Sequence, residues 1–158
     1  MDRIDRVSIV GMGAMGILYG DFFANALGRE QVTFLADSDR ARRYRNTPVY
    51  CNGRKMDFRI QDGAVPDSQG PAQLLLFAVK ATALGDAISV AGNQVGKDTV
   101  ILSVLNGITS EAVIGEALGM DHVLYCVSQG MDAVKLGNEL TYSHMGQICI
   151  GIPEDQAY

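Results

Sequence analysis

A glycine-rich turn between a short apolar run and a helical segment constrains this chain more than any other feature. The run Val7–Val10 is β-branched and ends at glycine, which is typical of a buried strand. Apolar residues then recur at helical spacing from position 14 to position 27. The turn between them has the spacing G-x-G-x-x-G and reads Gly11-Met12-Gly13-Ala14-Met15-Gly16. A strand, this spacing and a helix in direct succession predict the first βα unit of an α/β domain.

The rest of the chain alternates between apolar runs and helical segments. The further strands that we expect are Val32–Ala36, Leu74–Val79, Thr99–Val104 and Val123–Val127. The helices that we expect run from Asp37 to near Arg45, from Leu84 to Val95 and from Ser110 to Leu118. Strands separated by helices form right-handed βαβ crossovers and a parallel sheet. We therefore predict an α/β fold with a Rossmann-type, doubly wound and mostly parallel sheet.

Two segments depart from this alternation. Asn52-Gly53 is a strong hairpin signal and stands between two strand-like runs, Pro48–Cys51 and Lys55–Ile60. We expect an inserted β-hairpin there. Near the end of the chain, Leu140–Tyr142 and Gln147–Ile150 have the length of short strands without intervening helical periodicity. We expect these two to be antiparallel strands at an edge of the sheet.

Length and charge exclude several classes of protein. The chain has 158 residues with 47% apolar and 20% charged residues, which fits one globular domain. We expect that domain over residues 1–152, with residues 153–158 beginning a linker. The net charge of −5 argues against binding to nucleic acid or to an acidic membrane surface. No apolar run approaches the roughly 18–20 residues that span a bilayer.

The cysteines favour a reduced, cytoplasmic protein. Cys51, Cys126 and Cys149 are odd in number and far apart, and none belongs to a C-x-x-C pair. The two histidines, His122 and His144, are equally scattered. We therefore expect free thiols and no metal site.

The glycine spacing has a direct chemical interpretation. Gly11 permits the tight turn, Gly13 lets the backbone approach a pyrophosphate, and Gly16 allows close packing of the helix. The N-terminus of the helix then offers free N–H groups and a partial positive charge to phosphate oxygens. The alternative is a glycine-rich turn that binds no ligand. The order of strand, glycines and helix favours a dinucleotide site over residues 11–16, with Met12, Ala14 and Met15 between the glycines.

The end of the second expected strand carries contradictory signals about which dinucleotide binds. Asp37 stands 21 residues beyond Gly16, where a carboxylate accepts hydrogen bonds from an adenosine ribose and favours NAD. A group of arginines follows at once, and an arginine just past this strand accommodates the 2′-phosphate of NADP. The group comprises Arg40, Arg42, Arg43 and Arg45. It is equally well explained as the solvated face of a helix.

Two polar residues follow the next two strands. Lys80 comes after Leu74–Val79, and Asn106 follows Thr99–Val104. Ligands of open α/β sheets bind at the carboxyl ends of strands, so both side chains can reach one crevice. Lys80 would supply positive charge, and Asn106 a donor and an acceptor. Taken separately, Lys80 is better explained as a surface cation and Asn106 as a turn residue, whereas together, beside a dinucleotide motif, they favour a functional role.

Together these features resemble the N-terminal half of the ketopantoate reductase (2-dehydropantoate 2-reductase) family. The matching residues are the glycine turn, Val79-Lys80, Asn106-Gly107 and the later segment Val127–Ala133. The resemblance implies hydride transfer from NADPH to ketopantoate, giving pantoate for pantothenate and coenzyme A synthesis. It also implies that Lys80 lies beside the cofactor and that Asn106 touches cofactor and substrate.

The resemblance is incomplete in two respects. Asp37 stands where the family often has an NADP-selecting arginine, so Arg40 would take that role or NAD would be used. The family's catalytic lysine and a substrate-binding glutamate lie in a C-terminal helical domain. We expect that domain to be absent from this chain, and the chain alone to be inactive.

We therefore predict the NAD(P)H-binding half of a ketopantoate-reductase-like enzyme. NADP(H) is favoured and NAD(H) is the alternative, the substrate is a small 2-keto acid, and a homodimer is compatible with the sequence. Two other functions stay open: another two-domain hydroxy-acid dehydrogenase, and a non-enzymatic dinucleotide-binding or redox-sensing domain.

Overall fold

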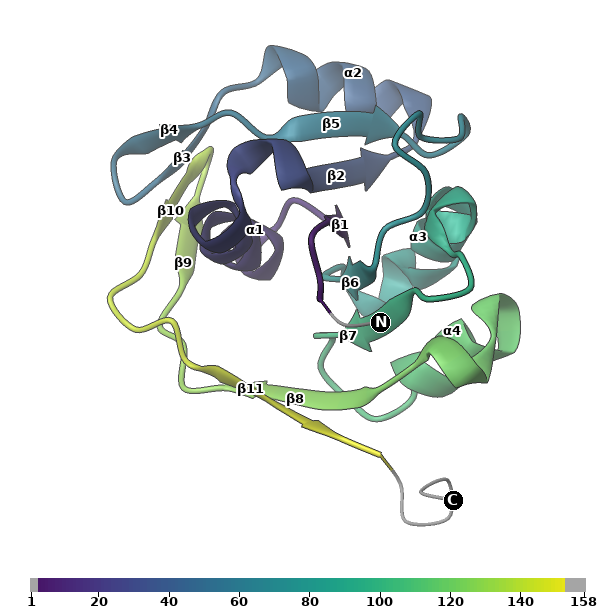
Figure 1. Cartoon of the computed structure of the whole chain (residues 1–158). Coiled ribbons are helices and arrows are strands. Elements are labelled where there is room, and N and C mark those ends of the chain that lie inside the picture. The colour runs from purple at the N-terminus through teal and green to yellow at the C-terminus, as the bar shows by residue number, and fades with distance from the viewer. Residues whose placement is uncertain (1–2, 153–158) are drawn as a thin grey trace.

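The computed structural model describes residues 3–152, and a five-stranded parallel sheet lies at its centre (Figure 1). Its strands in spatial order are β5 (Arg59–Asp62), β2 (Val32–Ala36), β1 (Val7–Val10), β6 (Leu74–Phe77) and β7 (Val100–Ser103). Every neighbouring pair in this sheet is parallel. The chain moves outward from β1 in one direction and then returns to place β6 on the other side. This order is that of a doubly wound Rossmann-type sheet, so the predicted fold class is confirmed.

Four α-helices lie between strands within residues 3–152. They are α1 (Ala14–Leu27), α2 (Ser38–Asn46), α3 (Leu84–Ala91) and α4 (Ser110–Leu118). Single 3₁₀ turns lie at Arg29–Gln31, Ala81–Ala83, Gly92–Gln94 and Met120–His122. Helix α1 covers one face of the sheet, while α3 and α4 lie on the opposite face (Figure 1). None of the helices within residues 3–152 is long and apolar enough to cross a membrane.

Both faces of the central sheet are buried, as the continuous apolar runs predict. Ile9, Phe34 and Leu76 pack on the side of α1, in a cluster that includes Tyr19. The intervening residues point the other way, toward α3 and α4, and include Val10, Leu35, Leu75 and Phe77. Adjacent strand residues therefore contribute to two separate apolar layers, which fixes the register of the sheet.

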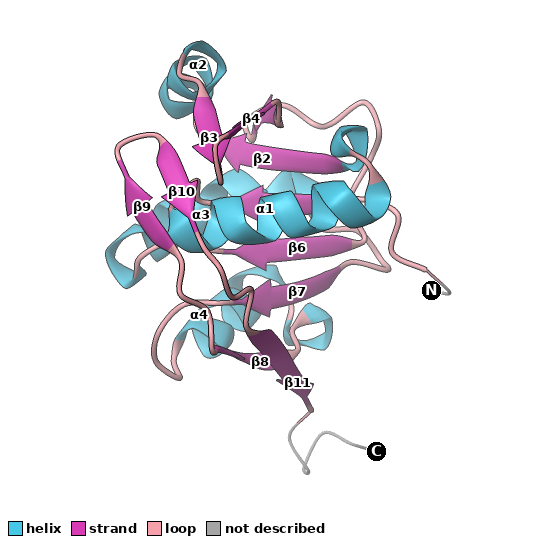
Figure 2. Cartoon of the chain, turned by 90° about the vertical axis from the view of Figure 1, so that its left-hand side faces the viewer, coloured by secondary structure: helices cyan, strands magenta, loops and turns pink. Residues whose placement is uncertain are grey.

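A second sheet of four strands packs on the outer side of α1. Its order is β4 (Arg54–Met56), β3 (Val49–Cys51), β10 (Glu139–Thr141) and β9 (Val134–Leu136). Figure 2 shows β9 and β10 lying beside α1. The contact is apolar, with Ile17 and Leu18 of the helix against residues of the sheet such as Cys51 and Leu140, all fully buried.

A buried polar cluster joins this second sheet to α1. Asp21 of the helix is 1% exposed, and its carboxylate accepts hydrogen bonds from Arg54 at 2.9 Å and from the hydroxyl of Tyr142 at 2.9 Å. Burial and the Asp21 carboxylate raise the pKa of Tyr142 to about 12. The same two causes raise the pKa of the buried thiol of Cys51 to about 11. The cluster therefore surrounds one buried anion with an arginine and with two groups, Tyr142 and Cys51, that stay neutral at ordinary pH.

The expected hairpin forms, but its second half is shorter than predicted. Strand β4 ends at Met56, and the residues from Arg59 onward form β5, which pairs with β2 at the edge of the central sheet. The chain turns back because the Phe58 ring packs on Phe34 of β2, with ring centroids 4.6 Å apart. The expectation for β10 is also wrong: the sequence predicted this strand at the edge of the central sheet. It lies inside the second sheet, parallel to β3 and antiparallel to β9.

The segment after α4 does not add a regular sixth parallel strand. Strand β8 (Tyr125–Gln129) pairs with β11 (Gln147–Gly151) in a separate antiparallel pair. This segment contacts the central sheet through a parallel bridge between Ile101 and Val123, beside which Leu124 N–H donates to the Ile101 carbonyl, and through the thiol of Cys126. The antiparallel prediction for β11 is therefore confirmed. The strand predicted at Val123–Val127 forms two residues later, and its parallel pairing with the central sheet is reduced to a single bridge. The predicted linker at 153–158 lies outside the described residues.

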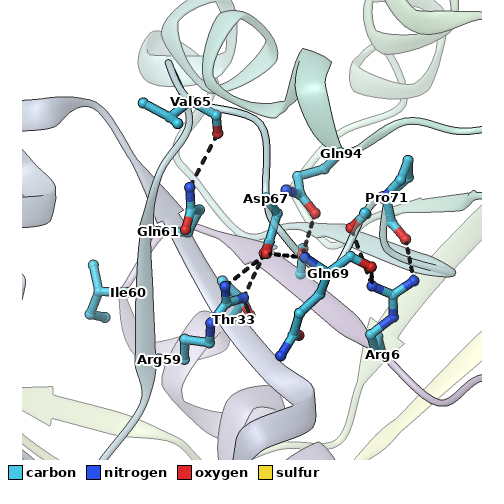
Figure 3. Close-up of polar contacts among 12 residues, drawn as sticks. Arg6, Thr33, Arg59, Ile60, Gln61, Val65, Asp67, Gln69, Pro71 and Gln94 are labelled. Atoms are coloured by element: carbon cyan, nitrogen blue, oxygen red, sulfur yellow. Dashed lines mark hydrogen bonds and ion pairs between the residues drawn. The ribbon is translucent and has the colours of Figure 1, made fainter.

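Polar contacts hold the loop between β5 and β6 against the amino ends of the strands (Figure 3). Asp67 accepts two hydrogen bonds from the guanidinium of Arg59, at 2.5 and 2.7 Å, and this pairing lowers the pKa of Asp67. Arg6 donates to the carbonyls of Gln69 and Pro71 in the same loop. These contacts lie at the end of the sheet opposite the carboxyl ends of its strands.

Candidate functional site

A cavity of about 860 Å³ lies at the carboxyl ends of β1, β2, β6 and β7. This is the position where open α/β sheets bind ligands, beside the reversal of strand order between β1 and β6. Residues from the glycine turn, from the end of β2, from the segments after β6 and β7, and from β8 line it. Its size is within the range of small-molecule and cofactor pockets.

The backbone of the glycine turn is tightly packed at two of its three glycines. Gly11 has a φ of +106°, and a Cβ there would lie 2.4 Å from the Ala78 carbonyl oxygen. A Cβ on Gly16 would lie 1.8 Å from the carbonyl oxygen of Gly11. Gly16 is thus required mainly by the turn itself, and less by the packing of helix on strand that the sequence suggested. A Cβ on Gly13 would meet nothing within 4 Å.

The first turn of α1 opens into the cavity. Gly13 is the N-cap residue and no side chain caps the helix, so N–H groups of the first turn keep their hydrogen-bonding capacity. No acidic residue occurs in this turn. Gly13, Ala14 and Met15 line the cavity, whereas Met12 packs against the core and the second sheet. The geometry suits an anion such as a pyrophosphate.

Asp37 and Arg40 stand together at the side of the cavity formed by β2. Asp37 caps α2: its Oδ1 accepts a hydrogen bond from the backbone N–H of Arg40 at 2.8 Å. Its Oδ2 lies 3.4 Å from Nη1 of the same arginine. The other three arginines of the group do not line the cavity; Arg42 pairs with Asp39, and Arg45 reaches the Ile60 carbonyl.

The structure brings Lys80 and Asn106 to the same cavity. Lys80 follows β6 and begins the 3₁₀ turn at Ala81–Ala83, and Asn106 follows β7. Both side chains are exposed. Since Gly11 is packed against Ala78, the segment that carries Lys80 lies directly beside the glycine turn. The roles assigned to these two residues remain predictions.

Sequence reasoning missed the contribution of β8 to the cavity. Cys126 and Ser128 of this strand, together with Thr82, line it. The thiol of Cys126 donates to the Ser103 carbonyl at 3.0 Å, and burial raises its pKa. The hydroxyl of Ser128 accepts a hydrogen bond from Tyr19 at 3.0 Å. Ser128 belongs to the segment Val127–Ala133 that resembles the family, but a single serine there does not by itself indicate that it lines a ligand site.

The two histidines lie away from the cavity. His122 contacts the Thr99 carbonyl through Nδ1 at 2.9 Å, before β7 begins. His144 pairs with Asp132 at 3.0 Å on the exposed surface, and the backbone and side chain of His144 lower the pKa of Asp132 to about 2. Within residues 3–152, no three His, Cys, Asp or Glu side chains gather in a way that could hold a metal ion.

Comparison with protein families gives a match over nearly the whole chain. Residues 7–155 match the model of the family described as ketopantoate reductase PanE/ApbA. The match begins at β1 and includes every strand and helix described above.

Solved structures share the fold. A 2-dehydropantoate 2-reductase from Geobacter metallireducens superposes with a TM-score of 0.72 at 23% identity, over 92% of this chain and 48% of that one. A D-mandelate dehydrogenase bound to NADH and anilino(oxo)acetate gives 0.71 at 19% identity, over 90% and 47%. A dimeric ketopantoate reductase from Staphylococcus aureus gives 0.67 at 18% identity, over 94% and 52%. The chain therefore spans about half the length of these relatives.

Proposed function

The chain belongs to the ketopantoate reductase PanE/ApbA family, and we propose that it is the nicotinamide-dinucleotide-binding half of an oxidoreductase that reduces a small 2-keto acid. Ketopantoate, reduced to pantoate for pantothenate and coenzyme A synthesis, is the substrate that we favour. The family match over residues 7–155 supports the reaction class. The likeness to solved reductases supports the fold on which that reaction depends.

One observation carries the proposal: groups suited to each part of a dinucleotide line a single cavity. Asp37 and Arg40 lie at the side of β2, where the adenosine ribose binds in Rossmann-type domains. The uncapped start of α1 lies in the middle, and Lys80 lies beside it. Asn106 lies at the side of β7, where the nicotinamide would reach. The free space at Gly13 leaves room for the pyrophosphate.

The protein's own groups would bind and orient the ligand. N–H groups of the first turn of α1 would donate to the pyrophosphate, and the ammonium of Lys80 would offset its charge. Asn106 would hold nicotinamide and substrate in reacting geometry through its amide. When bound, the reduced nicotinamide supplies the hydride that the keto carbon accepts. The general acid is expected from the C-terminal domain that the family resemblance implies.

We propose NADP(H) as the preferred cofactor, with NAD(H) as the alternative. Arg40 is half-buried at the side of the cavity where a 2′-phosphate would lie, which favours NADP. The carboxylate of Asp37 lies beside it and favours NAD. Because the guanidinium can rotate away from Asp37 toward a phosphate, we give Arg40 the greater weight.

The other candidate function is that of a hydroxy-acid dehydrogenase that acts on a different 2-keto acid. The observation that favours it is the fold shared with a D-mandelate dehydrogenase bound to NADH and anilino(oxo)acetate. Both candidates use a nicotinamide cofactor and a 2-keto acid, so they differ in the substrate side chain. A non-enzymatic dinucleotide-binding or redox-sensing domain differs from both because it would bind cofactor without a 2-keto acid.

Calorimetric titration of the chain with NADPH and NADH, each separately, tests the proposal. We expect saturable binding of one molecule per chain, with NADPH the tighter. Absence of binding by both cofactors would overturn it. Titrating the cofactor complex with ketopantoate and with benzoylformate then distinguishes the two candidate substrates.

Assembly and location are further parts of the proposal. A homodimer is supported by the fold shared with a dimeric ketopantoate reductase from Staphylococcus aureus. Cytoplasmic location is supported by the three free cysteines, one of them buried and one exposed. Sedimentation of the purified chain with and without NADPH tests the assembly.

A further inference from the structure

We propose that Ser128 donates a hydrogen bond to the carboxamide oxygen of the bound nicotinamide, and that the buried hydroxyl of Tyr19 positions it. Tyr19 belongs to α1, and Ser128 belongs to β8, which lies outside the central sheet. The inference rests on the proposed dinucleotide binding. It assigns a role to β8, a strand that carries neither the glycine motif nor Lys80 or Asn106.

The two hydroxyl groups are in direct contact. The Tyr19 hydroxyl lies 3.0 Å from Ser128 Oγ, and the Tyr19 side chain is 4% exposed. Ser128 is half-buried and lines the cavity. A residue of the first helix thus fixes a side chain 109 positions later in the chain. This contact is the polar link between α1 and β8 at the cavity wall.

The direction of this hydrogen bond follows from the chemistry of the two groups. A phenol is more acidic than an aliphatic alcohol, so Tyr19 is the better donor and Ser128 the better acceptor. Burial raises the pKa of Tyr19, which keeps its proton in place. Among the side-chain hydrogen bonds within residues 3–152, Ser128 Oγ takes part only in this one, so its own proton remains available. Accepting one bond also strengthens Ser128 as a donor.

The position of Ser128 determines which part of the ligand it meets. It shares the side of the cavity formed by β7 and β8 with Asn106 and Cys126. Cys126 is already engaged with the Ser103 carbonyl. In a dinucleotide that extends from Asp37 across the glycine turn, the nicotinamide occupies this side. Its carboxamide presents an oxygen that accepts hydrogen bonds, which matches the free donor of Ser128.

The experiment compares two ligands that differ in the nicotinamide ring. NADPH and 2′-phospho-ADP-ribose are titrated calorimetrically against the wild-type chain and against Ser128→Ala. We expect Ser128→Ala to weaken NADPH about 3- to 10-fold, the size of one net hydrogen bond, and to leave 2′-phospho-ADP-ribose unchanged. Ser128→Thr retains the hydroxyl and should bind NADPH as the wild type does. The same comparison with NADH and ADP-ribose applies if NAD is the cofactor.

Tyr19→Phe tests the positioning role. Loss of its hydroxyl should weaken NADPH but not 2′-phospho-ADP-ribose, and the double variant should bind no more weakly than Ser128→Ala alone. Ser89→Ala on the exposed side of α3, outside the cavity, is the matched control and should change neither affinity. The inference is overturned if Ser128→Ala changes neither affinity or changes both equally. If the wild-type chain binds neither ligand, the proposed function itself fails.

Discussion

The carboxylate of Asp37 caps α2 and at the same time faces the guanidinium of Arg40 in that helix. Oδ1 accepts the backbone N–H of Arg40 at 2.8 Å, and Oδ2 lies 3.4 Å from its Nη1. The residue expected to favour NAD and the residue expected to favour NADP therefore occupy one side of one cavity. Cofactor preference becomes a competition between two groups in contact.

This arrangement predicts opposite effects for two substitutions. Arg40→Ala should weaken NADPH about 10-fold, because a charge-assisted hydrogen bond to the 2′-phosphate is lost from a partly exposed site. NADH should be almost unaffected. Asp37→Ser keeps a capping oxygen for α2 but removes the negative charge, so NADPH should bind more tightly. Calorimetry with both cofactors checks this; NADPH binding that survives Arg40→Ala, with NADH binding lost in Asp37→Ser, would identify an NAD protein.

The glycine turn predicts a contrast between Gly13 and Gly16. Gly13→Val should abolish dinucleotide binding, because the side chain would fill space that is free in the structure and needed for the pyrophosphate. Its cost in stability should not exceed about 1 kcal/mol, the scale of a change of N-cap residue. Gly16→Ala should instead destabilise the fold, because its Cβ would lie 1.8 Å from the Gly11 carbonyl oxygen. Urea unfolding and calorimetry on both variants separate the two effects; Gly13→Val that still binds would contradict the prediction.

Local sequence patterns predicted where the helices and strands of this fold lie better than they predicted which strands pair with one another. The boundaries of α1, β1 and β2 follow from glycines and apolar spacing near each element. The hairpin arm expected over Lys55–Ile60 instead divides between β4 and β5, and the pairing of β5 with β2 is accompanied by a contact of Phe58 with Phe34, which is distant in sequence. Strand pairing is decided by such non-local contacts, and one sequence does not display them.

The site shows the same difference between features that nearby residues determine and features that distant contacts determine. The glycine turn, Lys80 and Asn106 could be located because each follows a strand that the sequence marks. Ser128 could not, since its place depends on Tyr19 and on β8 leaving the central sheet. The reason for Gly16 was also misjudged: the atom that excludes a side chain there belongs to Gly11, five residues earlier.

The cluster around Asp21 predicts a loss of stability in alkali. The pKa of Tyr142 is about 12 in the folded protein against an ordinary value of 10.0. A raised folded pKa gives stability that is complete below the unfolded value and is lost as the pH rises from 10 toward 12. The thiol of Cys51, with its pKa raised from 9.0 to about 11, adds a similar loss at lower pH. The second sheet should therefore detach from α1 in alkali.

Tyr142→Phe tests this explanation. It removes the hydrogen bond to a buried carboxylate, so it should lower the free energy of unfolding by about 1.5 kcal/mol near neutral pH. The difference from the wild type should shrink as the pH rises from 10 toward 12, because the wild type loses this contribution there. Tyr50→Phe, on the neighbouring strand β3, is a matched control. A difference that stays constant over this range would contradict the assigned cause.

Finally, we predict that the 158-residue chain binds the cofactor without reducing ketopantoate. A reductase needs a proton donor for the developing alkoxide, and Lys80, Asn106 and the two histidines are not well placed to be that donor. Lys80 lies beside the glycine turn, where its charge would meet the pyrophosphate. The amide of Asn106 does not release a proton at neutral pH, and His122 and His144 do not line the cavity.

The expected loss of reaction rate is large enough to be measured. Loss of general acid catalysis costs about 10²–10⁴ in rate, and loss of substrate positioning adds an effect of similar or larger size. An assay that follows nicotinamide absorbance at saturating NADPH should therefore show no turnover above background, whereas calorimetry on the same chain should show cofactor binding. Saturable reduction of ketopantoate by the chain alone would contradict the prediction. Lys80→Met and His144→Gln would then show whether the proton comes from the residue beside the cavity or from the histidine paired with Asp132.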